Sequence, residues 1–385
     1  MAKKTINKEL TGAQDLYNFL FEACNIIRGP VSQDNFKDYI TPLLYYKRIS
    51  DVYDEETEEA LISSGGDKEY ASLPEQHRFV IPDGCHWQEV RERTENLGAA
   101  IVGAMRQIEI ANPDTLYGVL SMFSSQKWTN KAILNDSKIR DLIEHLSKRK
   151  LGNKDYPADL MGDAYEILLK KFADDSKAQA GEFYTPRSVV RLLVHILDPQ
   201  PGETVYDPAC GSGGMLIEAI RYMHDDSLCC GSIFGQEKNV VNAAIAKMNL
   251  FLHGASDFNV MQGDTLRDPK ILQGGNIAKF DCVIANPPFS LENWGATEWS
   301  SDKYKRNIYG TPSDSCGDYA WIQHMICSMS SGKGRMAVVM PQGILFRGNQ
   351  EAEIRKQLVE SDLIEAVVTL GDKLFYGTGL SPCFL

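Results

Sequence analysis

Residues 286–289 carry side chains whose types and order suit the transfer of a group to an amine. They are Asn286, Pro287, Pro288 and Phe289, and they follow an apolar run at 280–285 that predicts a buried strand. Two prolines end such a strand, because they donate no backbone hydrogen bond and fix the direction of the chain. The amide oxygen of Asn286 and the carbonyl oxygen of Pro287 can then accept both N–H groups of one exocyclic amine. Such an amine is a poor nucleophile, so the site would act by alignment and electrostatics, with Phe289 stacking on a base taken out of a duplex.

A glycine-rich loop further upstream is typical of a nucleotide-type cofactor site. It lies between a predicted strand at 204–206 and a predicted helix at 214–224, and its candidate binding residues are Asp207, Gly211, Ser212, Gly213 and Gly214. Glycines let the backbone turn sharply, and the helix N-terminus presents free N–H groups to a carboxylate or a phosphate. NAD and S-adenosylmethionine both fit this pattern. The Asp207 carboxylate favours S-adenosylmethionine, because it can pair with an ammonium group and would repel a pyrophosphate.

Two further acidic residues follow the next predicted strands. Glu237 comes directly after the strand expected at 232–236, where a carboxylate can accept both hydroxyls of a ribose. Asp264 follows the strand expected at 259–261 and could accept a hydrogen bond from an adenine amino group. A turn-forming role is nearly as good an interpretation of Asp264. Both residues are candidates for the adenosine half of the cofactor.

The elements that must position these residues alternate between strand and helix after residue 153. Further apolar patterns predict strands at 335–340 and 363–370, and helices at 186–197, 239–252, 318–329 and 350–358. This alternation predicts an α/β fold with a doubly wound, mostly parallel, Rossmann-like sheet. Residues 1–152 instead predict an all-helical N-terminal domain, because apolar residues recur at helical spacing in 16–27, 39–53, 97–107 and 133–150. We place the boundary between residues 152 and 153, where Gly152 and Asn153 would end a helix.

Composition and charge narrow the function classes. The 385 residues are 43% hydrophobic and 24% charged, as in ordinary globular proteins. No apolar run approaches the ~20 residues that span a bilayer, and no signal peptide is recognisable, so we expect a cytoplasmic protein without membrane contact. The nine cysteines include no C-x-x-C pair, which predicts reduced thiols and neither a metal site nor a disulfide framework. A net charge of −12 has the wrong sign for a chain that holds DNA alone.

Together these motifs make the chain similar to a known family. Over nearly its whole length it resembles the modification (M) subunit of type I restriction–modification systems, an adenine-specific DNA methyltransferase. The resemblance rests on residues 19–21, 27–29, 37–39, 181–187, 207–214, 286–289, 318–321 and 323–325. It implies transfer of a methyl group from S-adenosylmethionine to N6 of adenine in DNA. It also implies a separate specificity (S) subunit that selects the sequence, a second M subunit, and a restriction (R) subunit in the full complex.

The resemblance also assigns cofactor residues. It implies that the segment before the first strand lines the cofactor pocket, partly around the methionine end, with Glu182, Phe183, Tyr184, Thr185, Pro186 and Arg187. The glycine-rich loop would close that pocket, Glu237 would hold the ribose and Asp264 would meet the adenine. The basic segment 301–307 is a candidate for contact with DNA phosphate. His324 and Trp321 are expected to be structural.

The residues themselves leave other functions open. The same tetrapeptide could serve N4 of cytosine, an adenine of RNA or a glutamine of a protein, because each target is an sp² nitrogen with two hydrogens. A non-catalytic scaffold and an NAD-dependent dehydrogenase are further alternatives, and both leave residues 286–289 without a role. The family continues past the position of Leu385, so we expect the last strand of the sheet to be interrupted in this chain.

Overall fold

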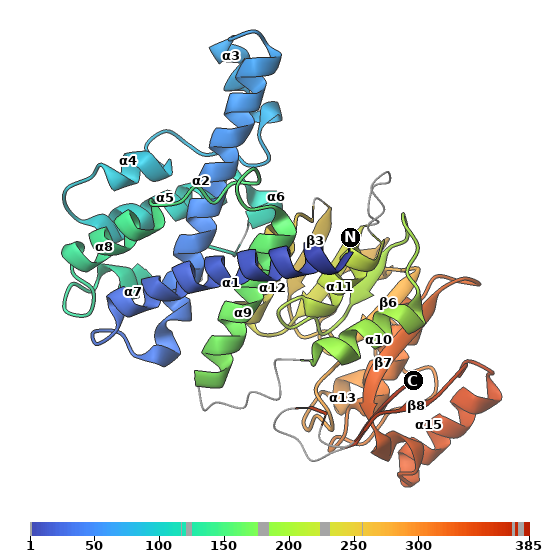
Figure 1. Ribbon diagram of the computed structural model, residues 1–385. Helices are drawn as coiled ribbons and strands as arrows, with labels where there is room; N and C mark the ends of the chain where they lie inside the picture. The colour runs from blue at the N-terminus through green and yellow to red at the C-terminus, as the bar shows by residue number, and fades with distance from the viewer. Residues whose placement is uncertain are drawn as a thin grey trace. The chain divides into compact units, whose positions relative to one another are not determined.

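The structure is a computed structural model that describes residues 2–116, 118–120, 125–175, 185–223, 232–255, 257–371, 374–375 and 381–385. Two compact units make up the chain. The first contains Met1–Ala178 with Leu252–Gly254, and the second contains Gln179–Phe251 with Ala255–Leu385 (Figure 1). The first unit is helical and the second contains the main sheet, which confirms the fold class predicted from the sequence.

Helices form the first unit. Within its described residues they are α1 (Ala2–Ile27), η1 (Gln33–Asn35), α2 (Lys37–Ser63), α3 (Lys68–Ala71), η2 (Pro74–Gln76), α4 (Trp87–Arg91), α5 (Leu97–Ala111), α6 (Pro113–Leu116), α7 (Ser125–Thr129), α8 (Asp136–Leu146) and α9 (Ala158–Asp175). Leu16, Leu20 and Ile27 of α1 are fully buried at helical spacing, as predicted. Helix α9 packs along α1 and belongs to this unit.

Charged residues of α2 hold the segment that follows α8. Arg48 donates to the carbonyl oxygen of Leu151, and Asp51 accepts from the backbone N–H of the same residue at 2.6 Å. Glu55 accepts from the backbone N–H of Asn153, also at 2.6 Å. Because Leu151 is completely buried, Arg48 and Asp51 satisfy backbone groups that water does not reach. The predicted domain boundary lies in this segment and stays a prediction. The segment itself is hydrogen-bonded to α2 of the first unit.

The second unit is built around a sheet with helices on both faces. Within its described residues the elements are α10 (Arg187–Leu197), β1 (Val205–Asp207), α11 (Gly214–Met223), β2 (Ile233–Glu237), α12 (Val240–Leu252), β3 (Phe258–Gln262), β4 (Leu272–Gln273), β5 (Asn276–Ile277), β6 (Cys282–Ala285), α13 (Ala296–Trp299), α14 (Asp318–Ser328), β7 (Arg335–Pro341), η3 (Gln342–Leu345), α15 (Asn349–Glu360), β8 (Val368–Thr369) and β9 (Pro382–Phe384). Seven of these described strands form one sheet in the order β3-β2-β1-β6-β7-β9-β8. The first five strands in that order are parallel, and β9 is antiparallel to both β7 and β8.

The strand order brings the two motif-bearing loops together. Strand β1 pairs in parallel with both β2 and β6, so that Val205 lies opposite Ile233 on one side and Cys282 on the other. The order of strands along the chain therefore reverses between β1 and β6. Ligands of open α/β sheets bind outside the carboxyl ends of the strands at such a reversal. The glycine-rich loop leaves β1 at this edge, and Asn286 directly follows β6 at the same edge.

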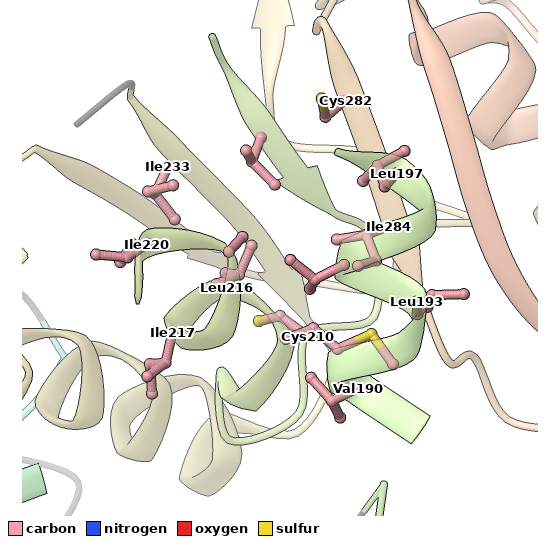
Figure 2. Packing of buried hydrophobic residues seen from close by; sticks show 14 of the residues in the cluster. Val190, Leu193, Leu197, Cys210, Leu216, Ile217, Ile220, Ile233, Cys282 and Ile284 are labelled. Carbon is pink, nitrogen blue, oxygen red and sulfur yellow. The ribbon is translucent and has the colours of Figure 1, made fainter. Parts of the chain in front are cut away.

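Alternate residues of the central strands enter two cores, one on each face of the sheet. Val205 and Ile284 face a core shared with α10 and α11, whereas Tyr206 and Val283 face a core shared with α14 and α15. Burial on both faces is expected for parallel strands. Figure 2 shows the first of these cores, in which α10 contributes Val190, Leu193 and Leu197.

One predicted strand is shorter than expected. The sequence predicted a strand over 363–370, but the structure has only Val368–Thr369 in β8. The reason is the neighbour. Among the described strands β8 pairs with β9 alone, and two residues of β9, Cys383 and Phe384, lie opposite it. Residues 363–367 extend beyond that partner and are mostly exposed. In the described part of the chain, no helix has the length and apolar character that a membrane crossing requires.

Candidate functional site

The glycine-rich loop makes a tight turn between β1 and α11. Gly211 and Gly213 have φ values of +53° and +84°, in the left-handed region that favours glycine. Gly214 begins α11, so the loop ends at a helix N-terminus. The carbonyl oxygen of Ser212 accepts a hydrogen bond of 3.0 Å from the side chain of Asn249. The turn is therefore held from α12, and its glycine backbone can approach a ligand closely.

Asp207 places a buried carboxyl at the start of this loop. Its Oδ1 accepts a hydrogen bond of 2.9 Å from the N–H of Ala209, and its side chain is almost completely buried. Burial raises the pKa of the Asp207 carboxyl to about 8, and the nearby charge of Glu237 adds to the increase. A cationic ligand would favour the ionised form and lower this pKa again. The contact of Asp207 with an ammonium group stays a prediction.

Glu237 ends β2 and bonds to the same loop. Its Oε2 accepts from the N–H of Gly211 at 2.9 Å, and its Oε1 accepts from the N–H of Asn239 at 2.7 Å. Burial raises the pKa of the Glu237 carboxyl. Each carboxylate oxygen can accept more than one hydrogen bond, so acceptor capacity remains for a pair of hydroxyls. The structure brings Glu237 to the loop, and its contact with a ribose stays a prediction.

Asp264 lies in a turn after β3 and already has partners. Its Oδ1 accepts from the N–H groups of Leu266 and Arg267 at 3.2 and 3.3 Å. Its Oδ2 forms an ion pair of 2.8 Å with Lys238, which follows Glu237. These contacts match the turn-forming interpretation that the sequence left open. The adenine contact of Asp264 stays a prediction.

Asn286 is positioned by the end of β6 and by Thr185, which lies two residues before the start of α10. Its Nδ2 donates a hydrogen bond of 2.9 Å to the hydroxyl of Thr185. Its Oδ1 is buried, and no described residue donates to it. Buried polar atoms are normally paired, so an unpaired acceptor beside a backbone turn indicates a place for a donor. This is the atom that the sequence predicted to accept an N–H of the target amine.

The remaining residues of the tetrapeptide differ in their exposure, and Phe289 packs against the core shared with α10 and α11. Pro287 is buried, Pro288 is exposed and Phe289 is half-buried. Ser290 comes next with φ of +50°, and its N–H donates to Oδ1 of Asp318 at 2.7 Å. Because Asp318 is the first residue of α14, the end of the turn is tied to that helix.

Two residues at this edge escaped the sequence analysis as functional candidates. Asp318 holds the turn and forms an ion pair of 2.8 Å with Arg347, which follows β7. The ring of Phe375 lies edge-on to that of Phe289, with centroids 6.2 Å apart. The sequence gives weak signals for both: a helix-starting aspartate after a loop, and an aromatic residue shortly before the last antiparallel strand.

The predicted cofactor segment is described only in part. Glu182, Phe183 and Tyr184 lie outside the described residues. Thr185 contacts Asn286 as stated above, Pro186 precedes α10, and Arg187 begins that helix with an exposed side chain. The structure therefore brings Thr185 to the tetrapeptide 286–289, which the sequence did not predict.

The basic segment 301–307 differs from its predicted role at one residue. Arg306 is 1% exposed, pairs with Asp302 at 2.9 Å and donates to the carbonyl oxygens of Thr265 and Leu266 at 2.8 and 2.7 Å. A buried guanidinium with these partners is not a phosphate contact, so the prediction is wrong for Arg306. The sequence pattern failed because it counts charges without showing which are paired inside.

His324 and Trp321 are structural, as predicted. Trp321 is buried in the core shared with α14 and α15. His324 contacts the hydroxyl of Tyr206 and the guanidinium of Arg306, each at 3.2 Å. Burial and the Arg306 charge lower the pKa of His324 well below its ordinary value. Its ring is therefore neutral and accepts from Arg306 at Nδ1.

The cysteines described by the structure are free thiols: Cys24, Cys85, Cys210, Cys282, Cys316, Cys327 and Cys383. Burial raises the pKa of the Cys282 and Cys316 thiols to about 12, so both stay protonated at neutral pH. Within the described ranges, no group of three or more His, Cys, Asp and Glu side chains could hold a metal ion.

Comparisons with known proteins agree with this architecture. The sheet order and the motifs after β1, β2 and β6 define a methyltransferase-type α/β domain. The family described as N-6 DNA Methylase matches residues 156–385, and the HsdM N-terminal domain matches residues 16–146. Because the first match covers more than half of the chain, the protein belongs to the N-6 DNA methylase family, the family of type I restriction–modification methylase subunits.

Individual relatives place the chain among the same proteins. It is 35% identical to the type I restriction enzyme MjaVII methylase subunit of Methanocaldococcus jannaschii, over 86% of this chain and 58% of that protein. It is 34% identical to the MjaVIII methylase subunit of the same organism, over 96% of this chain and 64% of that protein. The chain thus spans about three fifths of the length of these relatives.

A solved structure gives the same picture in three dimensions. The chain is similar to the type I restriction-modification system methyltransferase subunit from Streptococcus thermophilus, with a TM-score of 0.79 and 26% identity. The similarity covers 97% of this chain and 84% of that one. Both the helical unit and the sheet unit therefore have counterparts within a single known subunit.

Proposed function

We propose that this chain is the methylating subunit of a type I restriction–modification system. It transfers a methyl group from S-adenosylmethionine to N6 of adenine in DNA. The single observation that carries the proposal is the buried, unpartnered Oδ1 of Asn286 at the edge where the glycine-rich loop leaves the adjacent strand. Membership of the N-6 DNA methylase family supports the choice of adenine.

The residues around the glycine-rich loop suit S-adenosylmethionine. The cofactor supplies an activated methyl group on a sulfonium when it is bound. In our proposal the carboxylate of Asp207 pairs with its ammonium group, and Glu237 accepts from the ribose hydroxyls. The positive φ values of Gly211 and Gly213 let the backbone come close without a side chain between. Asp264 and the residues 182–187 complete the pocket as the family resemblance implies.

The tetrapeptide then handles the target base. Oδ1 of Asn286 and the carbonyl oxygen of Pro287 accept the two N–H groups of the amine, which directs the nitrogen lone pair at the methyl group. This orientation matters because the amine is otherwise delocalised into the ring. Phe289, with Phe375 edge-on beside it, offers an aromatic wall to a base rotated out of the duplex. No strong general base is needed for these steps.

In this proposal, partner subunits supply the selection of the DNA sequence and the cleavage of DNA. The relatives in the comparisons are methylase subunits of type I restriction enzymes. We therefore place this chain in the cytoplasm, in a complex with a specificity subunit, a second methylating subunit and, for cleavage, a restriction subunit. A net charge of −12 fits a partner that provides much of the attraction to DNA phosphate.

The proposal can be tested in a host that lacks DNA methylation. The chain is co-expressed with a type I specificity subunit from the same genome, and the nucleosides of the host DNA are separated and identified by mass spectrometry. We expect N6-methyladenine, and none when Asn286→Ala replaces the wild type. N4-methylcytosine in its place would overturn the choice of substrate, and the absence of any modified base would overturn the proposed activity.

A further inference from the structure

The amide of Asn286 is held at one end and free at the other. Its Nδ2 donates to the hydroxyl of Thr185 at 2.9 Å, and its buried Oδ1 receives no hydrogen bond from the described residues. The terminal amide of an asparagine can make a half-turn about its last side-chain bond. This rotation exchanges the positions of the amide oxygen and nitrogen. A hydrogen bond to one end of the amide therefore fixes the direction in which its other end points.

The Thr185 hydroxyl is held in place because its residue is joined to the start of α10. Thr185 precedes Pro186, whose carbonyl oxygen accepts from the N–H groups of Val189 and Val190 at 2.8 and 3.0 Å. Val190 and other apolar residues of α10 are buried in the core shown in Figure 2. Ile284 of β6, two residues before Asn286, belongs to the same core. Both partners of the hydrogen bond are thus attached to one packed unit.

We infer that Thr185 is a positioning residue for amino-group transfer. Its hydroxyl accepts the Nδ2–H of Asn286 and so anchors the amide in the orientation in which Oδ1 is open to the substrate amine. This inference rests on the proposed function, in which Asn286 binds that amine. It adds a role to the cofactor contact that the family resemblance implies for Thr185. It assigns the side-chain hydroxyl to the amide and leaves the cofactor contact to the other atoms of the residue.

The inference predicts different effects for two substitutions at one position. Thr185→Val keeps the branched shape but removes the acceptor, so the amide loses its anchor and a buried N–H loses its partner. We expect the methyl-transfer rate at saturating S-adenosylmethionine to fall roughly 10- to 100-fold, because the substrate acceptor is no longer oriented. Thr185→Ser keeps a hydroxyl and should restore most of the rate. The dissociation constant for S-adenosylmethionine should change less than about threefold in both variants. The hydroxyl acts on the Asn286 amide, so its loss should slow methyl transfer without weakening cofactor binding.

A matched control removes a different hydroxyl from the same unit. Thr204→Val deletes the 2.9 Å bond between the Thr204 hydroxyl and Asp281, before the start of β1. The rate of this variant, measured on the folded protein, should stay within about twofold of wild type, because the bond lies at the opposite ends of the strands.

The experiment is a single-turnover assay with labelled S-adenosylmethionine on unmethylated host DNA, with the protein assembled with its specificity subunit. Cofactor affinity is measured by calorimetry on the same preparations. Wild-type rates for Thr185→Val would overturn the inference, as would a loss of cofactor affinity that accounts for the whole loss of rate, or a failure of Thr185→Ser to recover activity. A wild-type complex that methylates no DNA would instead overturn the proposed function itself.

Discussion

Asp207 has an environment that a cationic ligand would change strongly. Its carboxyl is buried, and no described Lys or Arg side chain pairs with it. Burial raises its pKa from 3.8 to about 8, so the carboxyl of the cofactor-free protein carries a proton at neutral pH. Pairing with an ammonium group needs the carboxylate, and binding therefore releases that proton below a pH of about 8.

Because cofactor binding releases the proton of Asp207, cofactor affinity should depend on pH. The association constant for S-adenosylmethionine should rise up to roughly tenfold per pH unit as the pH increases toward the raised pKa of Asp207. Calorimetry in buffers of different ionisation enthalpy would measure both the constant and the proton released. Asp207→Asn should bind more weakly, without this pH dependence. A wild-type affinity that does not change over this range would contradict the role of Asp207.

Among the elements, α14 holds the turn after residues 286–289 through one side chain. The Asp318 carboxylate is fully buried, accepts from the N–H of Ser290 and pairs with Arg347. Removing it leaves a backbone N–H and a guanidinium without their partner. Asp318→Ala should therefore lower the free energy of unfolding by about 2–4 kcal/mol and reduce methyl transfer.

A control for Asp318 lies on the neighbouring helix. Lys356 and Glu360 of α15 form an exposed pair at 3.9 Å. Lys356→Ala should change the free energy of unfolding by less than about 0.5 kcal/mol, because exposed pairs contribute little. Chemical denaturation of wild type, Asp318→Ala and Lys356→Ala measures these free energies of unfolding. Equal stability of Asp318→Ala and wild type would refute the anchoring role of Asp318.

Arg306 links the segment after the tetrapeptide to the turn that contains Asp264. Its guanidinium donates to the carbonyl oxygens of Thr265 and Leu266, and the hydroxyl of Thr265 donates to the carbonyl oxygen of Pro208 at 2.6 Å. Arg306→Ala should loosen this turn, lower the melting temperature by several degrees and weaken cofactor binding. Lys303→Ala, in the same segment but exposed, should leave both unchanged. Thermal unfolding with and without S-adenosylmethionine measures both effects, and an unaltered melting temperature for Arg306→Ala would contradict them.

Local sequence patterns predicted the turns of the site, but they did not predict the hydrogen bonds between residues that lie far apart in the chain. The turns at 207–214 and 286–289 could be predicted because glycine and proline impose backbone geometry where they stand. The bond between Thr185 and Asn286 joins residues 101 positions apart, and no local pattern marks it. Arg306 gave a misleading signal for the same reason, since its partner carbonyls lie about 40 positions earlier in the chain.

At the scale of the whole molecule, charge argues for assembly with a partner. A net charge of −12 repels DNA at long range, and the described structure pairs Arg306 internally instead of presenting it. We expect the isolated chain to bind DNA only weakly, in the range of about 10⁻⁴–10⁻⁶ M that is usual for non-specific contacts, and the assembly with the specificity subunit to bind much more tightly. Fluorescence anisotropy at two salt concentrations compares them. Tight, sequence-specific binding by the chain alone would contradict this view.

In the proposed reaction, Asn286 presents its amide oxygen to a DNA adenine beside a bound cofactor. The most direct test of this role compares wild type and Asn286→Ala in the assembled complex, with methyl transfer to DNA and affinity for S-adenosylmethionine measured on the same samples. The account predicts loss of at least about 100-fold in the transfer rate, with cofactor affinity preserved. Transfer by Asn286→Ala at the wild-type rate would contradict it.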